Sequence, residues 1–135
     1  MKLHLKKITY EDLNSRQKEN YNFHKVSALL ADYGYSTIRL TDDWMGADFI
    51  AQHIGGDIPI LVQLKGRVTF DRKYEKKNLY ICFFDGHDCY LYPHDEILGK
   101  ILMDIGETDS WKVNGGYSWP TLSKKLKTLL EDYRI

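Results

Sequence analysis

Two apolar runs joined by a glycine turn constrain the fold of this chain more than any other feature. The first run follows Gly46 and ends at Ile54, and the second leads from Pro59 to Lys65. Between them lies Gly55-Gly56-Asp57, where glycine allows positive φ at low cost and Asp tolerates it. We therefore predict a β-hairpin that pairs residues 46–54 with residues 59–65.

The alternation of side chains along a strand assigns the polar residues of this hairpin to one face. Residues i and i+2 point the same way, so Gln63 and Lys65 share one face, while Ile60, Val62 and Leu64 share the other and can enter a core. Asp48 stands at the start of the first strand. Cross-strand pairing then brings Asp48 near Gln63 or Lys65, although the sequence alone leaves the register open.

The segment before the hairpin predicts an amphipathic helix over residues 15–33. Asn14 followed three residues later by Gln17 has the pattern of a capping box, and Gly34 is suited to end the helix. Glu19 lies one turn before an apolar stripe and projects towards the same face. The stripe recurs at helical spacing and consists of Phe23, Val26, Leu30 and Tyr33.

The rest of the chain alternates strand and helix patterns. Further strands are predicted near residues 36–41, 78–84 and 88–92, and residues 109–119 are expected to be irregular. A second helix is expected to begin with Pro93 as its first residue and to end at Gly106, and a last helix to start at Ser118 or Pro120. We predict one α/β domain over residues 1–135, with a central mixed sheet flanked by helices.

Composition narrows the environment and the partners. The 135 residues carry a formal net charge of zero, so any binding to nucleic acid must depend on a local patch. No apolar run is long enough to span a bilayer, and the N-terminus lacks the apolar stretch of a signal peptide, which favours the cytoplasm and no membrane partner. In that compartment Cys82 and Cys89, which could face each other across a hairpin, are expected to be reduced.

The hairpin resembles the sequence pattern of the PD-(D/E)XK, or restriction endonuclease-like, nuclease superfamily. Members carry an Asp at a strand start, a short hairpin, and then an acidic residue, any residue and a Lys on the next strand. Here Gly46-Ala47-Asp48 and Gln63-Leu64-Lys65 occupy these positions, within a resemblance that covers roughly residues 15–92. Gln63 departs from the usual Asp or Glu, although some members carry Gln.

The resemblance implies an αβββ core and a metal-dependent endonuclease that hydrolyses phosphodiester bonds in DNA. Mg²⁺ or Mn²⁺ would be held by Asp48, the side-chain oxygen of Gln63 and the main-chain carbonyl of Leu64, with Glu19 as a further acidic group. Lys65 would orient the attacking water and stabilise negative charge on the phosphate. A chain of this size that cuts both strands is expected to act as a homodimer.

Two alternatives remain open at the level of the sequence. The basic residues after the hairpin could hold phosphates while Phe70 and Tyr74 stack on bases, or they could form a solvated loop. Because Gln63 removes a negative charge, the chain could also be a non-catalytic nuclease-fold module that binds nucleic acid or a protein, or an unrelated α/β domain. The basic residues are Arg67, Arg72, Lys73, Lys76 and Lys77.

Overall fold

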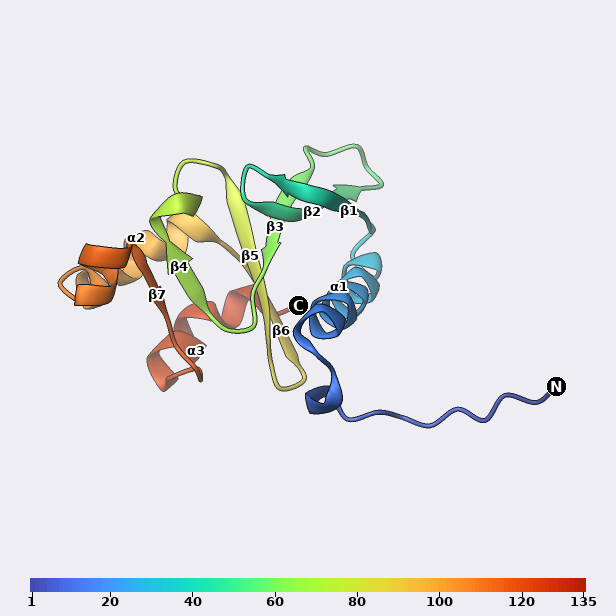
Figure 1. The fold of residues 1–135 in the computed structure, drawn as a ribbon. Helices are drawn as coiled ribbons and strands as arrows, with labels where there is room; N and C mark the ends of the chain where they lie inside the picture. Colours follow the sequence, from blue (N-terminus) through green and yellow to red (C-terminus); the bar gives the residue numbers. More distant parts are fainter.

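The computed structural model describes residues 1–135, whose elements follow one another in the order drawn in Figure 1. Short helical turns η1 (Tyr10–Asp12), η2 (Arg72–Tyr74), η3 (Ser110–Asn114) and η4 (Glu131–Tyr133) separate some of them. The helices are α1 (Ser15–Ala31), α2 (His94–Ile105) and α3 (Lys124–Leu130). The strands are β1 (Tyr35–Trp44), β2 (Ala47–His53), β3 (Ile60–Leu64), β4 (Thr69–Asp71), β5 (Leu79–Asp85), β6 (Asp88–Pro93) and β7 (Gly116–Ser118).

A five-stranded mixed sheet forms the centre of the molecule. Its strand order is β1-β2-β3-β5-β6, and β4 pairs with β7 in a separate two-stranded sheet. Neighbouring strands of the large sheet are antiparallel except for β3 and β5, which are parallel. The predicted α/β class with a central mixed sheet is therefore confirmed. None of the helices is both long enough and apolar enough to cross a membrane.

The predicted hairpin is confirmed, and the structure supplies its register. Phe49 pairs with Val62 and Ala51 pairs with Ile60, so one further step along the ladder places Asp48 opposite Gln63. Val62 and Phe49 are fully buried, as the alternation predicts for that face. The prediction that the strand begins at Gly46 was wrong, because Met45 and Gly46 have positive φ angles of 53° and 85° and form the β1–β2 turn.

Helix α1 packs on one face of the sheet and has the predicted N-terminus. The Asn14 side chain accepts a hydrogen bond from the Gln17 main chain, and the Gln17 side chain accepts one from Asn14, both at 2.9 Å. Val26 and Leu30 are buried against the sheet. Tyr33 was wrongly included in the buried stripe, because α1 ends at Ala31 and the tyrosine lies exposed in the turn that follows.

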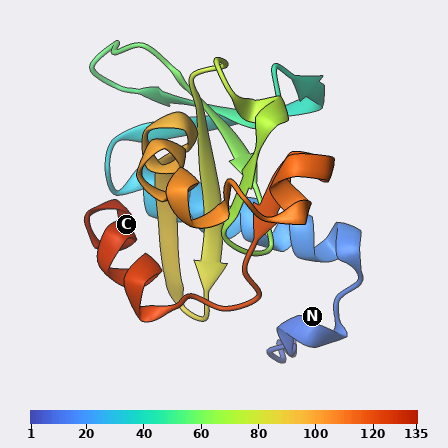
Figure 2. The ribbon, with the colours of Figure 1, turned by 90° about the vertical axis from the view of Figure 1, so that its left-hand side faces the viewer.

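The opposite face of the sheet is covered by α2, α3 and the small sheet, as Figure 2 shows with α2 in front of the sheet and α1 behind it.

Two helix starts differ from the prediction. Pro93 precedes α2 as its N-cap residue and is not its first helical residue. The last helix begins at Lys124, since Ser123 caps it by accepting a hydrogen bond from the Leu126 main chain.

The two cysteines lie side by side in the core beneath α1. Cys82 on β5 and Cys89 on β6 are both buried, and their sulfur atoms are 3.5 Å apart without a disulfide bond. The contact with Cys89, together with burial, raises the pKa of the Cys82 thiol well above its ordinary value. Cys82 therefore remains a protonated thiol that packs as a small apolar side chain.

Candidate functional site

The structure brings Asp48 into direct contact with the main chain of β3. One carboxylate oxygen of Asp48, Oδ2, accepts a hydrogen bond from the Leu64 N–H at 2.8 Å. Asp48 lies opposite Gln63 in the ladder, and this bond ties its carboxylate to the peptide between Gln63 and Leu64. The three residues of the sequence pattern therefore meet at one end of the β2–β3 hairpin.

Gln63 contributes an oxygen atom that no group of the protein satisfies. Its amide nitrogen Nε2 donates to the Leu64 carbonyl at 3.3 Å, whereas its oxygen Oε1 is buried and has no hydrogen-bond partner. An unpaired buried acceptor costs about 1–3 kcal/mol, and such groups are rare in folded proteins. Gln63 therefore holds an unsatisfied oxygen acceptor on the residue opposite Asp48 in the ladder.

Lys65 lies just beyond the end of β3 and is held by a main-chain bond from its N–H to the Cys82 carbonyl at 2.9 Å. Its ammonium nitrogen lies 5.3 Å from the ring centre of Tyr74, within the range of a cation–π contact. Tyr74 in turn packs on the β1–β2 turn, where a Cβ added to Gly46 would lie 3.2 Å from its ring. Tyr74 thus connects Lys65 with the turn that precedes Asp48.

The environment of Asp48 favours its neutral form. Burial, which acts most strongly, raises the pKa of Asp48 to about 6, and the charges of Asp43 and Glu19 act in the same direction. The hydrogen bond from Leu64 and the charge of Lys65 oppose this rise. A carboxyl group that titrates near neutrality in this way is typical of functional sites, where a ligand or substrate restores the balance of charge.

The sequence did not indicate Asp43 near the site, and it indicated Tyr74 only as a residue that could stack on bases. Trp44 pairs with Ala47 across the β1–β2 turn, so Asp43 lies just before that turn, and its charge acts on Asp48. A two-residue turn at Met45-Gly46 would have indicated this position, but the predicted strand ended at residue 41. Nothing in the local sequence indicates that Tyr74 reaches the site, which it does through tertiary packing.

Glu19 lies at the margin of the site and is paired with another residue. Its carboxylate is exposed and forms an ion pair with Arg39 of β1 at 3.2 Å. The Arg39 guanidinium also donates to the Asn20 side chain. The negative charge of Glu19 therefore raises the pKa of Asp48. The ion pair with Arg39 holds the Glu19 carboxylate towards β1.

The basic stretch after β3 is attached to the layer formed by α2. The main-chain N–H groups of Asp71 and Lys76 donate to His94 Nε2 and to Asp95 Oδ2, at 3.0 and 2.8 Å. The Arg72 guanidinium lies 5.1 Å from the ring centre of Trp111. Lys77 is partly buried. The other four basic residues are exposed, namely Arg67, Arg72, Lys73 and Lys76.

The two aromatic residues within this stretch cannot stack on bases. Phe70 is 0 % exposed and Tyr74 is 3 % exposed, because both rings pack in the core between the sheet and α2. Phe70 lies 5.4 Å from the ring of Tyr92, and Tyr74 lies 5.6 Å from the ring of His94. That part of the sequence interpretation was wrong, and only the basic side chains are available to hold phosphates.

The raised pKa of Asp48 predicts a stability effect that depends on pH. Its folded pKa, about 6, lies above its ordinary value of 3.8, so the native state binds the proton more tightly than the unfolded state does. The tighter proton binding by the native state therefore adds fully to the free energy of unfolding below pH 4. This added stability is lost as the pH rises through 6 and Asp48 ionises in the folded protein. We expect Asp48→Asn to raise the melting temperature at pH 8 by about 3 °C or more and to leave it nearly unchanged at pH 4.

Thermal unfolding in EDTA, followed by circular dichroism, tests this expectation. Asn keeps a side-chain oxygen that can accept from Leu64, so the comparison isolates the charge. Asp109→Asn is the matched control, because Asp109 is exposed and its side chain makes no capping bond. An Asp48→Asn variant less stable than the parent at pH 8 would contradict the prediction.

The oxygen atoms at the site are of the type that a hard divalent cation binds. No group of three or more His, Cys, Asp or Glu side chains is arranged to hold a metal ion. The donors are instead the Asp48 carboxylate and the unpartnered Oε1 of Gln63, with the Leu64 carbonyl nearby. Mg²⁺ is commonly bound through one or two carboxylates together with waters and substrate phosphates, and Asp48 supplies one carboxylate of this kind.

No model of a known protein family matches the chain, and no curated protein sequence matches it either.

Proposed function

We propose that the chain is a metal-dependent endonuclease of the restriction endonuclease-like type that hydrolyses phosphodiester bonds in DNA. One observation carries this proposal: the hydrogen bond from the Leu64 N–H to Asp48 holds the carboxylate against the main chain of the residue between Gln63 and Lys65. A carboxylate, an unsatisfied amide oxygen and an ammonium group thereby converge at one end of the hairpin. The chain order α1-β1-β2-β3 supports the proposal, because a helix followed by three strands is the order expected of this class.

Each of the three side chains has a distinct part in the proposed reaction. A divalent cation bound at the site would neutralise charge on the phosphate and lower the pKa of a bound water. Asp48 and Gln63 would supply its side-chain ligands, with Asp48 ionised. The Lys65 ammonium would face the oxygens on which negative charge develops, where a preorganised cation acts most strongly.

The exposed basic side chains beyond Lys65 would hold the backbone of the DNA. Lys73 lies over the same Tyr74 ring as Lys65, with its nitrogen 5.2 Å from the ring centre. The basic stretch therefore starts next to the proposed reaction centre and is held firmly against α2. Two copies of the chain would be needed to cut both strands of a duplex, so we expect a homodimer on DNA.

A second function follows from Gln63 itself. A neutral amide in place of a carboxylate leaves Asp48 as the main negative ligand, and Arg39 already pairs with Glu19. A site with so little charge could bind DNA through its basic side chains without cutting it. We therefore keep a non-catalytic nucleic-acid-binding module as the alternative.

Titration of Mn²⁺ by calorimetry tests the proposed metal site. We expect weak binding to the free protein and tighter binding when duplex DNA is present, because the phosphate supplies the charge that Gln63 lacks. Asp48→Ala should abolish this binding, and Asp109→Ala, which removes an exposed carboxylate elsewhere, should not. Equal binding in wild type and Asp48→Ala would show that the metal binds at another place.

A further inference from the structure

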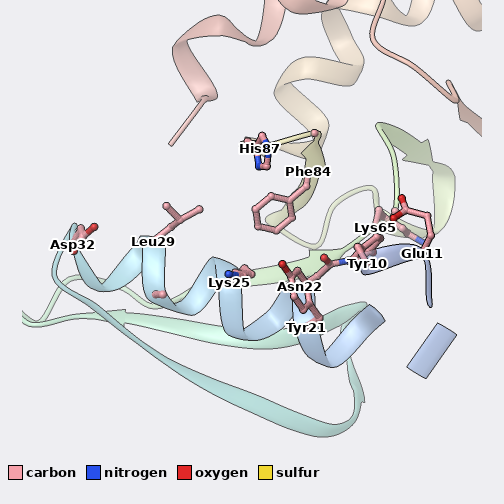
Figure 3. A pocket seen from close by; sticks show the side chains of 13 residues that line it. Tyr10, Glu11, Tyr21, Asn22, Lys25, Leu29, Asp32, Lys65, Phe84 and His87 are labelled. Atoms are coloured by element: carbon pink, nitrogen blue, oxygen red, sulfur yellow. The ribbon is translucent and has the colours of Figure 1, made fainter. Parts of the chain in front are cut away.

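A cleft of about 620 Å³ opens beside Lys65, on the α1 side of the molecule. Figure 3 shows α1 along one wall, with Phe84 and His87 of the β5–β6 hairpin on the other. Lys65 and Glu11 lie at one end, and Leu29 and Asp32 at the other. Lys65 is the residue that the cleft shares with the candidate site, so a strand placed on the site could continue into the cleft.

One aromatic and one basic side chain, Tyr21 and Lys25, lie next to each other on the α1 wall. Tyr21 and Tyr10 meet edge to face with ring centres 5.3 Å apart, and Asn22 donates to the Tyr10 hydroxyl at 2.9 Å. The Lys25 nitrogen lies 5.2 Å from the centre of the Tyr21 ring. These contacts fix the position of Tyr21, which nevertheless remains 37 % exposed and can present its ring to a ligand.

The chemistry of the walls identifies the ligand class. An aromatic ring next to a lysine suits a flat base attached to a phosphate, as in proteins that bind single strands by stacking. A base in a duplex is stacked on both faces and cannot offer one to a side chain unless it leaves the stack. Pockets of this volume are large enough for a single small ligand.

We propose that this cleft binds an unpaired nucleotide next to the phosphate held by Lys65, with its base on Tyr21 and its own phosphate at Lys25. The inference rests on the proposed function, because it deepens the choice of substrate at the same site. It assigns single-stranded or branched DNA as the substrate class in preference to an intact duplex. The acids Glu11 and Asp32 at the two ends keep the cleft nearly neutral, so stacking provides most of the affinity.

Binding of a fluorescent oligothymidylate in EDTA measures this directly, because no metal is present and no cleavage can occur. We expect Tyr21→Ala to weaken binding by about fivefold or more, the range found when a stacking ring is removed. Tyr21→Phe should bind like the wild type, because the ring is retained. Lys25→Ala should flatten the dependence of log affinity on log salt by about 0.7, the value for one phosphate contact with a single strand.

Two surface variants and a duplex probe serve as controls. Tyr33→Ala removes an exposed tyrosine just after α1, and Lys100→Ala removes an exposed lysine on α2. Neither residue lines the cleft, so neither change should alter oligothymidylate binding. Binding of a blunt duplex should be unaffected by Tyr21→Ala.

The outcomes separate this inference from the proposed nuclease activity. If wild type fails to bind oligothymidylate, or if Tyr21→Ala binds it as well as wild type does, the cleft assignment is wrong even when the protein cuts DNA. If Tyr21→Ala weakens duplex and single-strand binding equally, the preference for an unpaired nucleotide is wrong. If binding depends on Tyr21 but no DNA is cut, the cleft assignment holds and the nuclease proposal fails.

Discussion

Replacing Lys65 with alanine is expected to lower the rate of DNA cleavage at least tenfold while leaving the fold and the DNA affinity almost unchanged. A cation that acts on transition-state charge in a partly dry site contributes a few kcal/mol, and each 1.4 kcal/mol corresponds to about a tenfold change in rate. The main-chain bond from Lys65 to Cys82 does not involve the side chain. The fold therefore loses only the contact with Tyr74, which amounts to about 0.5–1 kcal/mol.

Single-turnover cleavage at saturating DNA measures this effect, because it separates the chemical step from binding. Lys73→Ala is the matched control, since Lys73 and Lys65 lie over the same Tyr74 ring at 5.2 and 5.3 Å. The control should weaken DNA binding and leave the single-turnover rate close to that of wild type. Equal loss of rate in both variants would indicate a general electrostatic effect and would argue against a specific part for Lys65.

The elements around the site could be predicted because their signals are local. The Gly55-Gly56-Asp57 segment, the alternation from Ile60 to Leu64 and the Asn14–Gln17 capping box each lie within a few residues of one another. Local patterns of this kind depend on backbone geometry and hardly on the rest of the fold. The contact between Asp48 and β3 followed from the hairpin once its strands were paired.

The parts that were mispredicted depend on contacts between distant segments. Strands β4 and β7 have three residues each and pair across a separation of more than forty residues, as Thr69 with Ser118. Three residues are too few to show a period of two. Phe70 belongs to this pair, and its ring and that of Tyr74 lie in the core, where the local sequence had suggested exposed rings within a charged stretch.

Two side chains at the site lower the stability of the fold, and such side chains are typical of functional sites. Asp48 is partly buried with a pKa raised to about 6, and Gln63 Oε1 is buried without a partner. Both features destabilise the metal-free protein. Natural sequences keep such conflicts mainly where a ligand or a reaction requires them.

Replacing Gln63 with glutamate is expected to bind Mn²⁺ at least tenfold more tightly and to destabilise the metal-free protein. The change adds a second partly buried carboxylate opposite Asp48, whose own pKa is already raised by burial. Above pH 6 the two like charges repel each other, so we expect a fall in melting temperature of about 3 °C or more in EDTA. Saturating Mn²⁺ should reverse this fall, because a ligand that binds only the folded state stabilises it.

Thermal unfolding with and without Mn²⁺, together with calorimetry, tests both halves of this expectation. Gln17→Glu is the matched control, because it adds the same charge to the α1 capping box, where an acidic residue is favourable. This control should change neither Mn²⁺ affinity nor the effect of Mn²⁺ on stability.

If Gln63→Glu is active on DNA while wild type is not, the chain is a nuclease fold that lost its activity through this residue. If it gains neither metal affinity nor cleavage, Asp48 and Gln63 are not metal ligands, and the non-catalytic module becomes the better account of the molecule.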